Sequence, residues 1–373
     1  MNHLSVLIKP ASSLCNMRCT YCFYADISGH RAAPSRGIMS SDFRQAILEN
    51  IVRDLEDQDE ITLAFQGGEP TLAGLAWYEA FIQSFLSVQE QAGKKGIVVN
   101  YALQTNGLLL DRAWGEFLRQ NNFLVGLSLD GRARFHNRSR LDARGQGTYD
   151  QVLRGKGLLE EWGVEYNILT VLTNEMAKYP EKICRFIEDE KIRYIQFIPC
   201  LEDLEPGTIS KNALHPIRFA NFYTALLRWW IGNVERGRYI SVKFFDDVVN
   251  LFFKGIPTAC GIDGQCHVQY IVEADGSVYP CDFYALDEYN AGNLTRQTLR
   301  EIFETDTMRS FVLSPRTAAP LCRTCTYWNI CRGGCKRMQG VMYYGSGGIC
   351  GYKTFLDRCL KPLEYAVKRF YLI

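Results

Sequence analysis

Apolar and polar positions along the first two thirds of the chain follow a pattern typical of an α/β protein. Short runs rich in apolar and β-branched residues predict six strands, at Leu4–Lys9, Ile61–Gln66, Val98–Gln104, Leu124–Leu129, Tyr166–Leu172 and Tyr194–Ile198. Helical spacing between them predicts helices at Ser41–Leu55, Leu75–Gln91, Asp111–Gln120, Tyr149–Trp162 and Tyr179–Glu190. This alternation implies right-handed crossovers and a parallel sheet. Six units are too few for a closed eight-stranded barrel, so we expect an open, partial (β/α)6 barrel.

The pattern changes near residue 240. After a predicted helix at Phe219–Glu235, glycine and cysteine become dense, and helical periodicity fades until Leu299–Glu304. A chain of 373 residues suits two domains. We therefore expect one domain over residues 1–240 and a second over residues 241–373.

Glycines and polar residues gather directly after the predicted strands. Three cysteines follow the first strand, Gly67-Gly68-Glu69-Pro70 the second, Gln104-Thr105-Asn106-Gly107 the third, Asp130-Gly131 the fourth, and Cys200 with Leu201 the sixth. Ser128 lies inside the fourth strand. In parallel α/β folds the carboxyl ends of the strands build the active site. Agreement across five segments predicts a single site at that edge.

The three cysteines after the first strand are Cys15, Cys19 and Cys22, in the order Cys-x3-Cys-x2-Cys. This spacing places three thiolates in one tight loop, where they can hold three irons of a cubane cluster and leave the fourth iron open. An open metal position is typical of a catalytic site. A zinc site or buried thiols are the alternatives, but zinc requires four ligands and the next histidine is His30.

Composition restricts the class of partner. The formal net charge is +1, and no apolar run has the length of a transmembrane helix, so we expect neither a nucleic-acid nor a membrane partner. The N-terminal residues contain no signal-peptide pattern, which favours a cytoplasmic protein. In a reducing compartment, 14 cysteines indicate metal binding rather than disulfides.

Eight further cysteines form an array in the last third of the chain. They are Cys260, Cys266, Cys281, Cys322, Cys325, Cys331, Cys335 and Cys350. Eight thiolates can close two four-iron clusters, and full thiolate ligation suits electron transfer. Structural zinc is the alternative for the residues from Cys322 to Cys335. We assign Cys184, Cys200 and Cys359 to no cluster and expect Cys184 in the core.

The first cysteine motif, with the aromatic Tyr21 before its third cysteine, resembles the radical S-adenosylmethionine (SAM) enzymes. This resemblance implies that SAM chelates the open iron, and it matches the partial barrel. The Gly67-Gly68-Glu69-Pro70 segment resembles the family's GGE motif, which meets the SAM amino group; a simple strand-to-helix turn is the alternative. By the same alignment, Ser128 and Arg140 are candidates for the SAM carboxylate and Leu201 for the adenine. Arg140 as a solvated loop charge is the alternative.

The C-terminal array resembles the SPASM extension of radical SAM peptide maturases. This resemblance implies two auxiliary [4Fe-4S] clusters, and therefore three in the whole protein. The first would use Cys260, Cys266, Cys281 and Cys335, and the second would use Cys322, Cys325, Cys331 and Cys350.

Three longer segments resemble the anaerobic sulfatase-maturating enzymes: IKPASSLCNMRCTYCFY, FQGGEPTLAG and VEADGSVYPCDFY. The resemblance implies oxidation of a sulfatase cysteine or serine to Cα-formylglycine, through a 5′-deoxyadenosyl radical that removes a Cβ hydrogen. It implies an unfolded or nascent sulfatase partner with a Cys/Ser-x-Pro-x-Arg motif and a reductant protein such as flavodoxin or ferredoxin. A monomer is the default expectation.

The resemblance also indicates Asp282 as the base that takes the proton of the target residue. Asp282 follows the ligand Cys281 within Tyr279-Pro280-Cys281-Asp282-Phe283-Tyr284, and burial among aromatic rings would raise its basicity. A turn aspartate is the alternative. Tyr24 is either a cavity residue or a core residue.

Two other functions share parts of this pattern. A SPASM maturase that forms thioether or carbon–carbon crosslinks in ribosomal peptides has both cysteine arrays. Such enzymes usually carry an N-terminal peptide-binding domain, and we expect none before a strand that begins at Leu4. A non-catalytic iron–sulfur electron carrier would need neither the Gly67–Pro70 segment nor Ser128.

Overall fold

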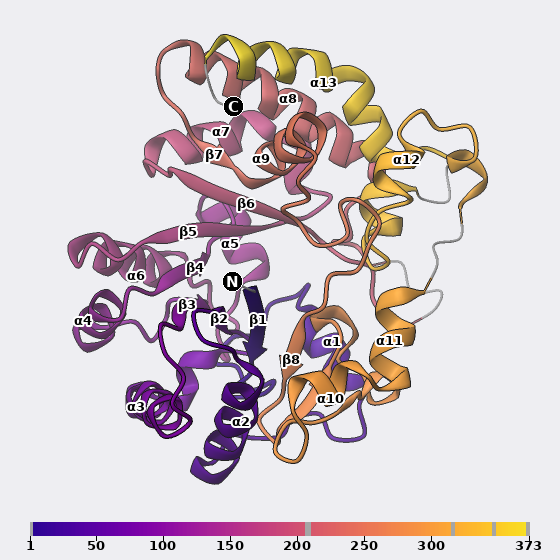
Figure 1. The fold of residues 1–373 in the computed structure, drawn as a ribbon. Coiled ribbons are helices and arrows are strands. Elements are labelled where there is room, and N and C mark those ends of the chain that lie inside the picture. The colour runs from indigo at the N-terminus through magenta and orange to yellow at the C-terminus, as the bar shows by residue number, and fades with distance from the viewer. Residues whose placement is uncertain (1–2, 206–209, 315–317, 345–347, 371–373) are drawn as a thin grey trace. The chain divides into compact units, whose positions relative to one another are not determined.

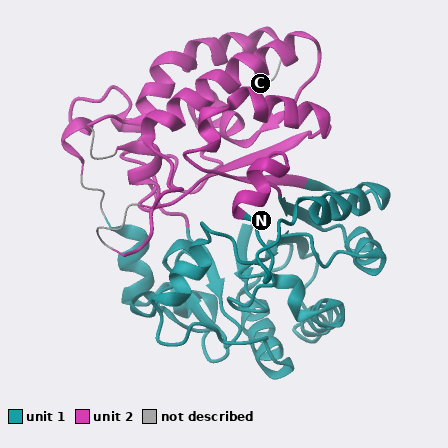
Figure 2. Cartoon of the chain, turned by 180° about the vertical axis from the view of Figure 1, so that it is seen from behind, with its two compact units in different colours: residues 1–128, 140–166, 268–314 teal, residues 129–139, 167–267, 315–373 magenta. Residues whose placement is uncertain are grey.

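A computed structural model describes residues 3–205, 210–314, 318–344 and 348–370. The chain forms two compact units, and neither is continuous in sequence (Figure 2). Unit 1 comprises residues 1–128, 140–166 and 268–314, and unit 2 comprises residues 129–139, 167–267 and 315–373. Part of the cysteine-rich region therefore folds with the N-terminal strands, while the domain boundary near residue 240 stays a prediction.

The sheet of unit 1 has a parallel centre. Strands β1 (His3–Ile8), β2 (Glu60–Phe65), β3 (Val98–Thr105) and β4 (Leu124–Ser128) lie side by side in that order (Figure 1). On the other side of β1, β8 (Tyr270–Val272) pairs in parallel, followed by antiparallel β9 (Ser277–Tyr279) and β10 (Gly292–Asn293). The cysteine-rich region thus extends the sheet that begins the chain.

Helices of unit 1 connect these strands and follow the cysteine loop. They are α1 (Phe23–Gly29), α2 (Ser41–Asp54), α3 (Leu75–Gln91), α4 (Arg112–Gln120), α6 (Tyr149–Glu161), α10 (Leu299–Phe303) and α11 (Asp306–Leu313). Ser40 caps α2 by accepting from Phe43 N, and Asp111 caps α4 by accepting from Trp114 N, because these first-turn amides have no partner within the helix.

Unit 2 contains the remaining strands. Strand β5 (Tyr166–Leu172), which begins at the last residue of a unit 1 segment, pairs in parallel with β6 (Tyr194–Pro199), and β6 pairs with β7 (Ser241–Val242). The helices are α5 (Ala133–Ser139), α7 (Pro180–Asp189), α8 (Pro216–Glu235), α9 (Lys243–Val249), α12 (Trp328–Cys331) and α13 (Gly351–Arg369). Helices α8 and α13 lie against each other, as Figure 1 shows.

All six predicted strands and the predicted helices are confirmed, with ends shifted by a few residues at most. The sequence pattern missed the long helix α13 and five short helices, which are α1, α5, α9, α11 and α12. It also missed the pairing of β8 with β1, which joins segments far apart in the chain. No helix among the described residues has the length and apolar character needed to cross a membrane.

Candidate active site

The cysteine loop of unit 1 runs from the end of β1 to the start of α1. Cys15, Cys19 and Cys22 are all partly buried, and Cys22 is the residue directly before α1. Met17 N donates to Cys15 Sγ at 3.3 Å, and the Cys22 thiol is an electrostatic neighbour of Cys15. Burial raises the pKa of the Cys15 thiol to about 11. The loop therefore brings thiol ligands together, and a bound cation would favour their deprotonated form.

The turn after β2 is fitted against this loop. Gly68 N donates to Ser12 O at 2.9 Å, and Glu69 N donates to Leu14 O at 2.7 Å. Gly67 has φ of +134°, and a Cβ on it would lie 2.6 Å from Ser12 O. A Cβ on Gly68 would overlap the backbone of Leu14. Both glycines are required because the two backbones approach closely here.

Glu69 is the buried acid of this turn, with a side chain that is 1% exposed. Its Oε1 accepts from Thr71 Oγ1 at 2.6 Å and Thr105 Oγ1 at 2.8 Å, and its Oε2 accepts from Asn106 N at 2.7 Å. Burial raises the pKa of Glu69, although these hydrogen bonds oppose the effect. Asn106 Nδ2 also donates to Asn16 Oδ1 at 2.7 Å, which ties the end of β3 to the cysteine loop.

The other residues predicted to contact SAM fall into two groups. Within unit 1, Gln104 Nε2 donates to Ser128 Oγ at 3.0 Å, and the buried Arg140 lies over the ring of Tyr21 at 5.6 Å. Arg140 is therefore not a solvated loop charge. Leu201 is buried in unit 2, directly after Cys200.

Asp282 lies at the centre of a buried polar cluster in unit 1 and is 7% exposed. The hydroxyl of Tyr24 donates to Asp282 Oδ2, and Gln66 Nε2 donates to the same oxygen at 3.2 Å and to Tyr24 Oη at 2.7 Å. Lys9 Nζ lies 2.9 Å from Asp282 Oδ1. Burial and the adjacent Asp282 raise the pKa of Tyr24, so its hydroxyl keeps its proton and acts as the donor.

A second buried carboxylate continues this cluster. Lys9 Nζ lies 3.7 Å from Glu273 Oε1, and Arg31 Nη1 donates to the same oxygen at 2.7 Å. Arg31 Nη2 donates to Tyr279 Oη at 3.1 Å. Burial would raise the pKa of Glu273, but Lys9 and Arg31 outweigh it and hold the pKa below its usual range. Charges of opposite sign therefore alternate from Arg31 to Asp282.

Sequence reasoning missed Lys9, Gln66, Arg31 and Glu273. Lys9 and Gln66 directly follow β1 and β2, so the rule that pointed to the other strand ends applies to them as well. Arg31 and Glu273 are separated by 242 positions, and no local pattern connects them.

Three cysteines of the array lie together in unit 2. Cys260, Cys266 and Cys335 are electrostatic neighbours, and the thiol of Cys260 accepts from the backbone of His267. A Cβ on Gly261, which has φ of +71°, would lie 2.9 Å from Cys335 Cβ. Cys281, the fourth ligand that the resemblance implies for this cluster, belongs to unit 1.

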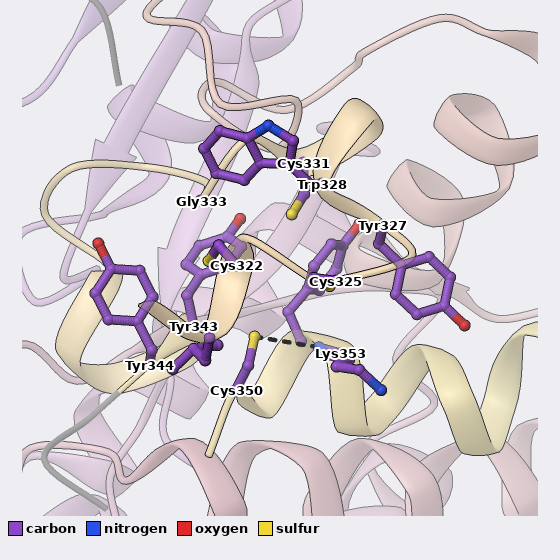
Figure 3. A pocket seen from close by; sticks show the side chains of 12 residues that line it. Cys322, Cys325, Tyr327, Trp328, Cys331, Gly333, Tyr343, Tyr344, Cys350 and Lys353 are labelled. Atoms are coloured by element: carbon purple, nitrogen blue, oxygen red, sulfur yellow. Dashed lines mark hydrogen bonds between the residues drawn. The ribbon is translucent and has the colours of Figure 1, made fainter. Parts of the chain in front are cut away.

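Four other cysteines of unit 2 surround a common pocket (Figure 3). They are Cys322, Cys325, Cys331 and Cys350. Lys353 N donates to Cys350 Sγ at 3.3 Å. The described residues lining the pocket offer four thiols and no imidazole or carboxylate, which is the donor set of an iron–sulfur cluster. Among the described residues, no group of three or more His, Cys, Asp or Glu side chains is arranged to hold a single metal ion.

Comparison with known proteins defines the class. The Radical SAM superfamily matches residues 10–187, and the SPASM iron-sulfur cluster-binding domain matches residues 264–326. The chain is a radical SAM enzyme with a partial (β/α)6 barrel and a cysteine-rich SPASM domain. It uses SAM and iron–sulfur clusters.

The curated relatives narrow this class. A cysteine-type anaerobic sulfatase-maturating enzyme of Clostridium novyi is 36% identical over 99% of this chain and 98% of its own. One from Clostridium perfringens is 39% identical over 91% of this chain and 90% of its own. A serine-type enzyme of Klebsiella aerogenes is 29% identical over 96% of this chain and 86% of its own.

Solved structures agree with these relatives. The structure described as native anSMEcpe with bound AdoMet and Cp18Cys peptide has a TM-score of 0.89 and 34% identity, over 98% of this chain and 99% of that one. Streptococcus suis SuiB bound to S-adenosylmethionine, at 19% identity and a TM-score of 0.61 over 90% of this chain and 73% of its own, shares the fold. The chain belongs to the anaerobic sulfatase-maturating enzymes, oxidoreductases that generate Cα-formylglycine in sulfatases.

Proposed function

We propose that this chain oxidises a cysteine of an unfolded or nascent sulfatase polypeptide to Cα-formylglycine, with Asp282 as the base. The buried cluster around Asp282, in the same unit as the Cys15–Cys22 loop, is the observation that carries this proposal. The choice of cysteine over serine is supported by the relatives, because cysteine-type enzymes are 36–39% identical and serine-type enzymes are 26–29% identical. The target segment would contain Cys-x-Pro-x-Arg.

The cofactors would be held by residues that follow strands or end them and by Arg140, which follows helix α5. Cys15, Cys19 and Cys22 would ligate the first cluster. Residues of the turn after β2, with Ser128, Arg140 and Leu201, would contact SAM. When bound, SAM and its cluster supply the radical that removes the Cβ hydrogen, and the auxiliary clusters take up the remaining electron.

The residues around Asp282 suit proton removal from the target thiol. Asp282 Oδ1 forms an ion pair with the ammonium of Lys9 at 2.9 Å and accepts no hydrogen bond from another described residue, so it has fewer donors than Oδ2. Tyr24 and Gln66 both bind Oδ2 and thereby fix the orientation of the carboxylate. Lys9 balances the negative charge of the Asp282 carboxylate, because burial of an unpaired charge would cost free energy. Each of these residues would act on the position or charge of the base.

Replacing Asp282 tests its role. The anaerobically reconstituted enzyme with SAM, a reductant and a Cys-x-Pro-x-Arg peptide should yield the aldehyde and 5′-deoxyadenosine in step. Asp282→Asn should still cleave SAM and lose aldehyde formation by at least about 100-fold, the usual range for removal of a general base. The exposed Glu288, whose change to Gln should have no effect, provides the control. Wild-type aldehyde yield from Asp282→Asn would overturn the assignment.

A paired peptide experiment tests the substrate. Peptides that differ only in Cys or Ser at the target position should give faster aldehyde formation from Cys. SAM cleavage with both peptides unchanged would instead support the crosslinking maturase, which requires a different peptide.

The remaining parts of the proposal concern partners and location. We propose a monomer in the cytoplasm that receives electrons from a flavodoxin or ferredoxin. Light scattering of the reconstituted enzyme tests the first point, and aldehyde formation with purified flavodoxin as the electron donor tests the last.

A further inference from the structure

Tyr352 contributes a buried hydroxyl to unit 2 that none of the described residues satisfies. Its side chain is 0% exposed and lines the pocket of Cys322, Cys325, Cys331 and Cys350. The hydroxyl has no hydrogen-bond partner among the described residues. A buried donor without an acceptor is destabilising, so such a group indicates a partner that the described residues do not provide.

The surroundings of this hydroxyl limit what the partner can be. Its electrostatic neighbours are Cys331, Asp247, Cys350 and the hydroxyl of Tyr343. Asp247 is already engaged, because its Oδ1 binds both the ammonium of Lys243 and the hydroxyl of Thr258, the latter at 2.7 Å. The thiol sulfurs of Cys331 and Cys350 are acceptors near the Tyr352 hydroxyl.

The ring of Tyr352 is held in place. The centre of the Tyr343 ring lies 5.4 Å from that of Tyr352 at an angle of 62°, and the Phe244 ring lies 6.1 Å away at 64°. Edge-to-face packing of this kind restricts the ring to one orientation. The hydroxyl is thus positioned before any cluster is bound.

The start of helix α13 supplies a second donor to the same pocket. Cys350 is the N-cap of α13, and its Sγ accepts from Lys353 N, as the dashed line in Figure 3 shows. The N-terminus of a helix also carries partial positive charge. The first turn of α13 therefore directs a backbone amide to the sulfur of Cys350 and places Tyr352 on the lining of the same pocket.

We infer that the Tyr352 hydroxyl donates a hydrogen bond to a sulfur of the cluster that Cys322, Cys325, Cys331 and Cys350 hold, and thereby raises its reduction potential. Reduction adds negative charge to the cluster, and a donor stabilises the reduced form more than the oxidised form. The cluster then accepts an electron more readily. Tyr352 is a positioning residue that acts on electron transfer without touching the substrate. This inference rests on the proposed ligation by the four cysteines.

The midpoint potential of this cluster tests the inference. Cys15, Cys19 and Cys22 are changed to Ala, which leaves only the auxiliary clusters for an anaerobic titration followed by electron paramagnetic resonance. In this background Tyr352→Phe should shift one auxiliary signal to a more negative potential and leave the other unchanged. A tenfold change in the reduction equilibrium corresponds to about 59 mV for one electron, so a shift of that order is resolved.

Tyr327→Phe is the matched control. Tyr327 lines the same pocket and has Cys325 as an electrostatic neighbour, but its hydroxyl points away from the cysteines in Figure 3 and donates to Asp357. Its loss should leave both potentials unchanged. Equal potentials for the wild type and Tyr352→Phe, at equal iron content, would overturn the hydrogen bond. Low iron content in the variant that lacks only Cys15, Cys19 and Cys22 would instead contradict the ligation of a cluster by the four cysteines of the pocket.

A second variant separates the loss of the hydrogen bond from a change in packing. Tyr352→4-fluorophenylalanine fills the volume of the hydroxyl without a donor and should give the same negative shift as Tyr352→Phe. A shift with Phe that is absent with 4-fluorophenylalanine would contradict the inference, because it would be caused by a cavity.

Discussion

At the scale of single residues, Lys9 links two buried carboxylates that both lie far from it in the sequence. Its ammonium lies between Asp282 and Glu273, and all three side chains are almost fully buried. Removal of one partner from a buried ion pair typically costs about 3–5 kcal/mol because a charge is left without compensation. The effect of changing Lys9 should therefore appear in stability as well as in catalysis.

Lys9→Met should lower the free energy of unfolding by about 3 kcal/mol or more and reduce aldehyde formation more than SAM cleavage. Lys9→Arg, which restores the charge, should recover most of the stability and part of the aldehyde yield. Denaturant unfolding and product analysis under anaerobic conditions measure both effects. A Met variant with unchanged stability would show that Asp282 and Glu273 find other compensation.

The pKa of Cys15 gives a prediction for the protein without iron. Because burial raises this pKa to about 11, only a small fraction of the thiol is ionised at neutral pH. Alkylation of Cys15 by iodoacetamide should therefore rise about tenfold for each pH unit until the pH approaches that value. Mass spectrometry of the alkylated peptide gives the rate at each pH. A rate that levels off near pH 8 would contradict a buried, protonated thiol.

At the scale of elements, the turn after β2 and the cysteine loop form one assembly. A Cβ on Gly68 would overlap backbone atoms of Leu14, and backbone cannot move aside as a flexible side chain can. The glycine is therefore a structural requirement of the loop that presents the first three cysteines.

Gly68→Ala should displace the cysteine loop, lower the iron bound at the first cluster and weaken SAM binding at least tenfold. Gly29→Ala is the control, because Gly29 ends helix α1 and a Cβ there would meet no atom within 4 Å. Iron analysis and calorimetric titration with SAM provide the readouts. A Gly68→Ala variant that binds iron and SAM as the wild type does would contradict the requirement for glycine at this position.

The elements also show how far the sequence predicts this fold. Strand and helix periodicity located β1 to β6 and most of the longer helices but not α13, because each located element buries one face and repeats at a fixed period. The same reasoning placed glycines and cysteines at strand ends. It missed β8 because a three-residue strand has too few residues to show alternation. The positions of Lys9 and Asp282 relative to each other depend on that pairing, which is set by long-range packing.

At the scale of the whole molecule, the two units differ in the cysteines they contribute. Unit 1 carries the loop of three cysteines and Cys281, and unit 2 carries the pocket of four. Loss of the four-cysteine pocket should therefore impair electron uptake and leave the first cluster intact.

Cys322→Ala combined with Cys350→Ala should lower bound iron by about a third, one cluster of the proposed three. SAM cleavage should persist, while aldehyde formation falls sharply because the second electron has no acceptor. The holoenzyme should also unfold at a lower temperature, since a ligand that binds only the folded state stabilises it. Iron content, both product yields and the thermal midpoint are measured together. Unchanged aldehyde yield would indicate that this pocket does not take part in turnover.

The parallel pairing of β1 with β8 has a consequence for the synthesis of the chain. Val6 leaves the ribosome early, but its partner Tyr270 follows only after most of the protein has been made. At a synthesis rate of about 5–20 residues per second, one edge of β1 stays unpaired for on the order of tens of seconds. An unpaired strand edge is a template for other chains. The nascent protein therefore passes through a long interval in which a chaperone would have to shield that edge, and Asp282 joins Lys9 only when this interval ends.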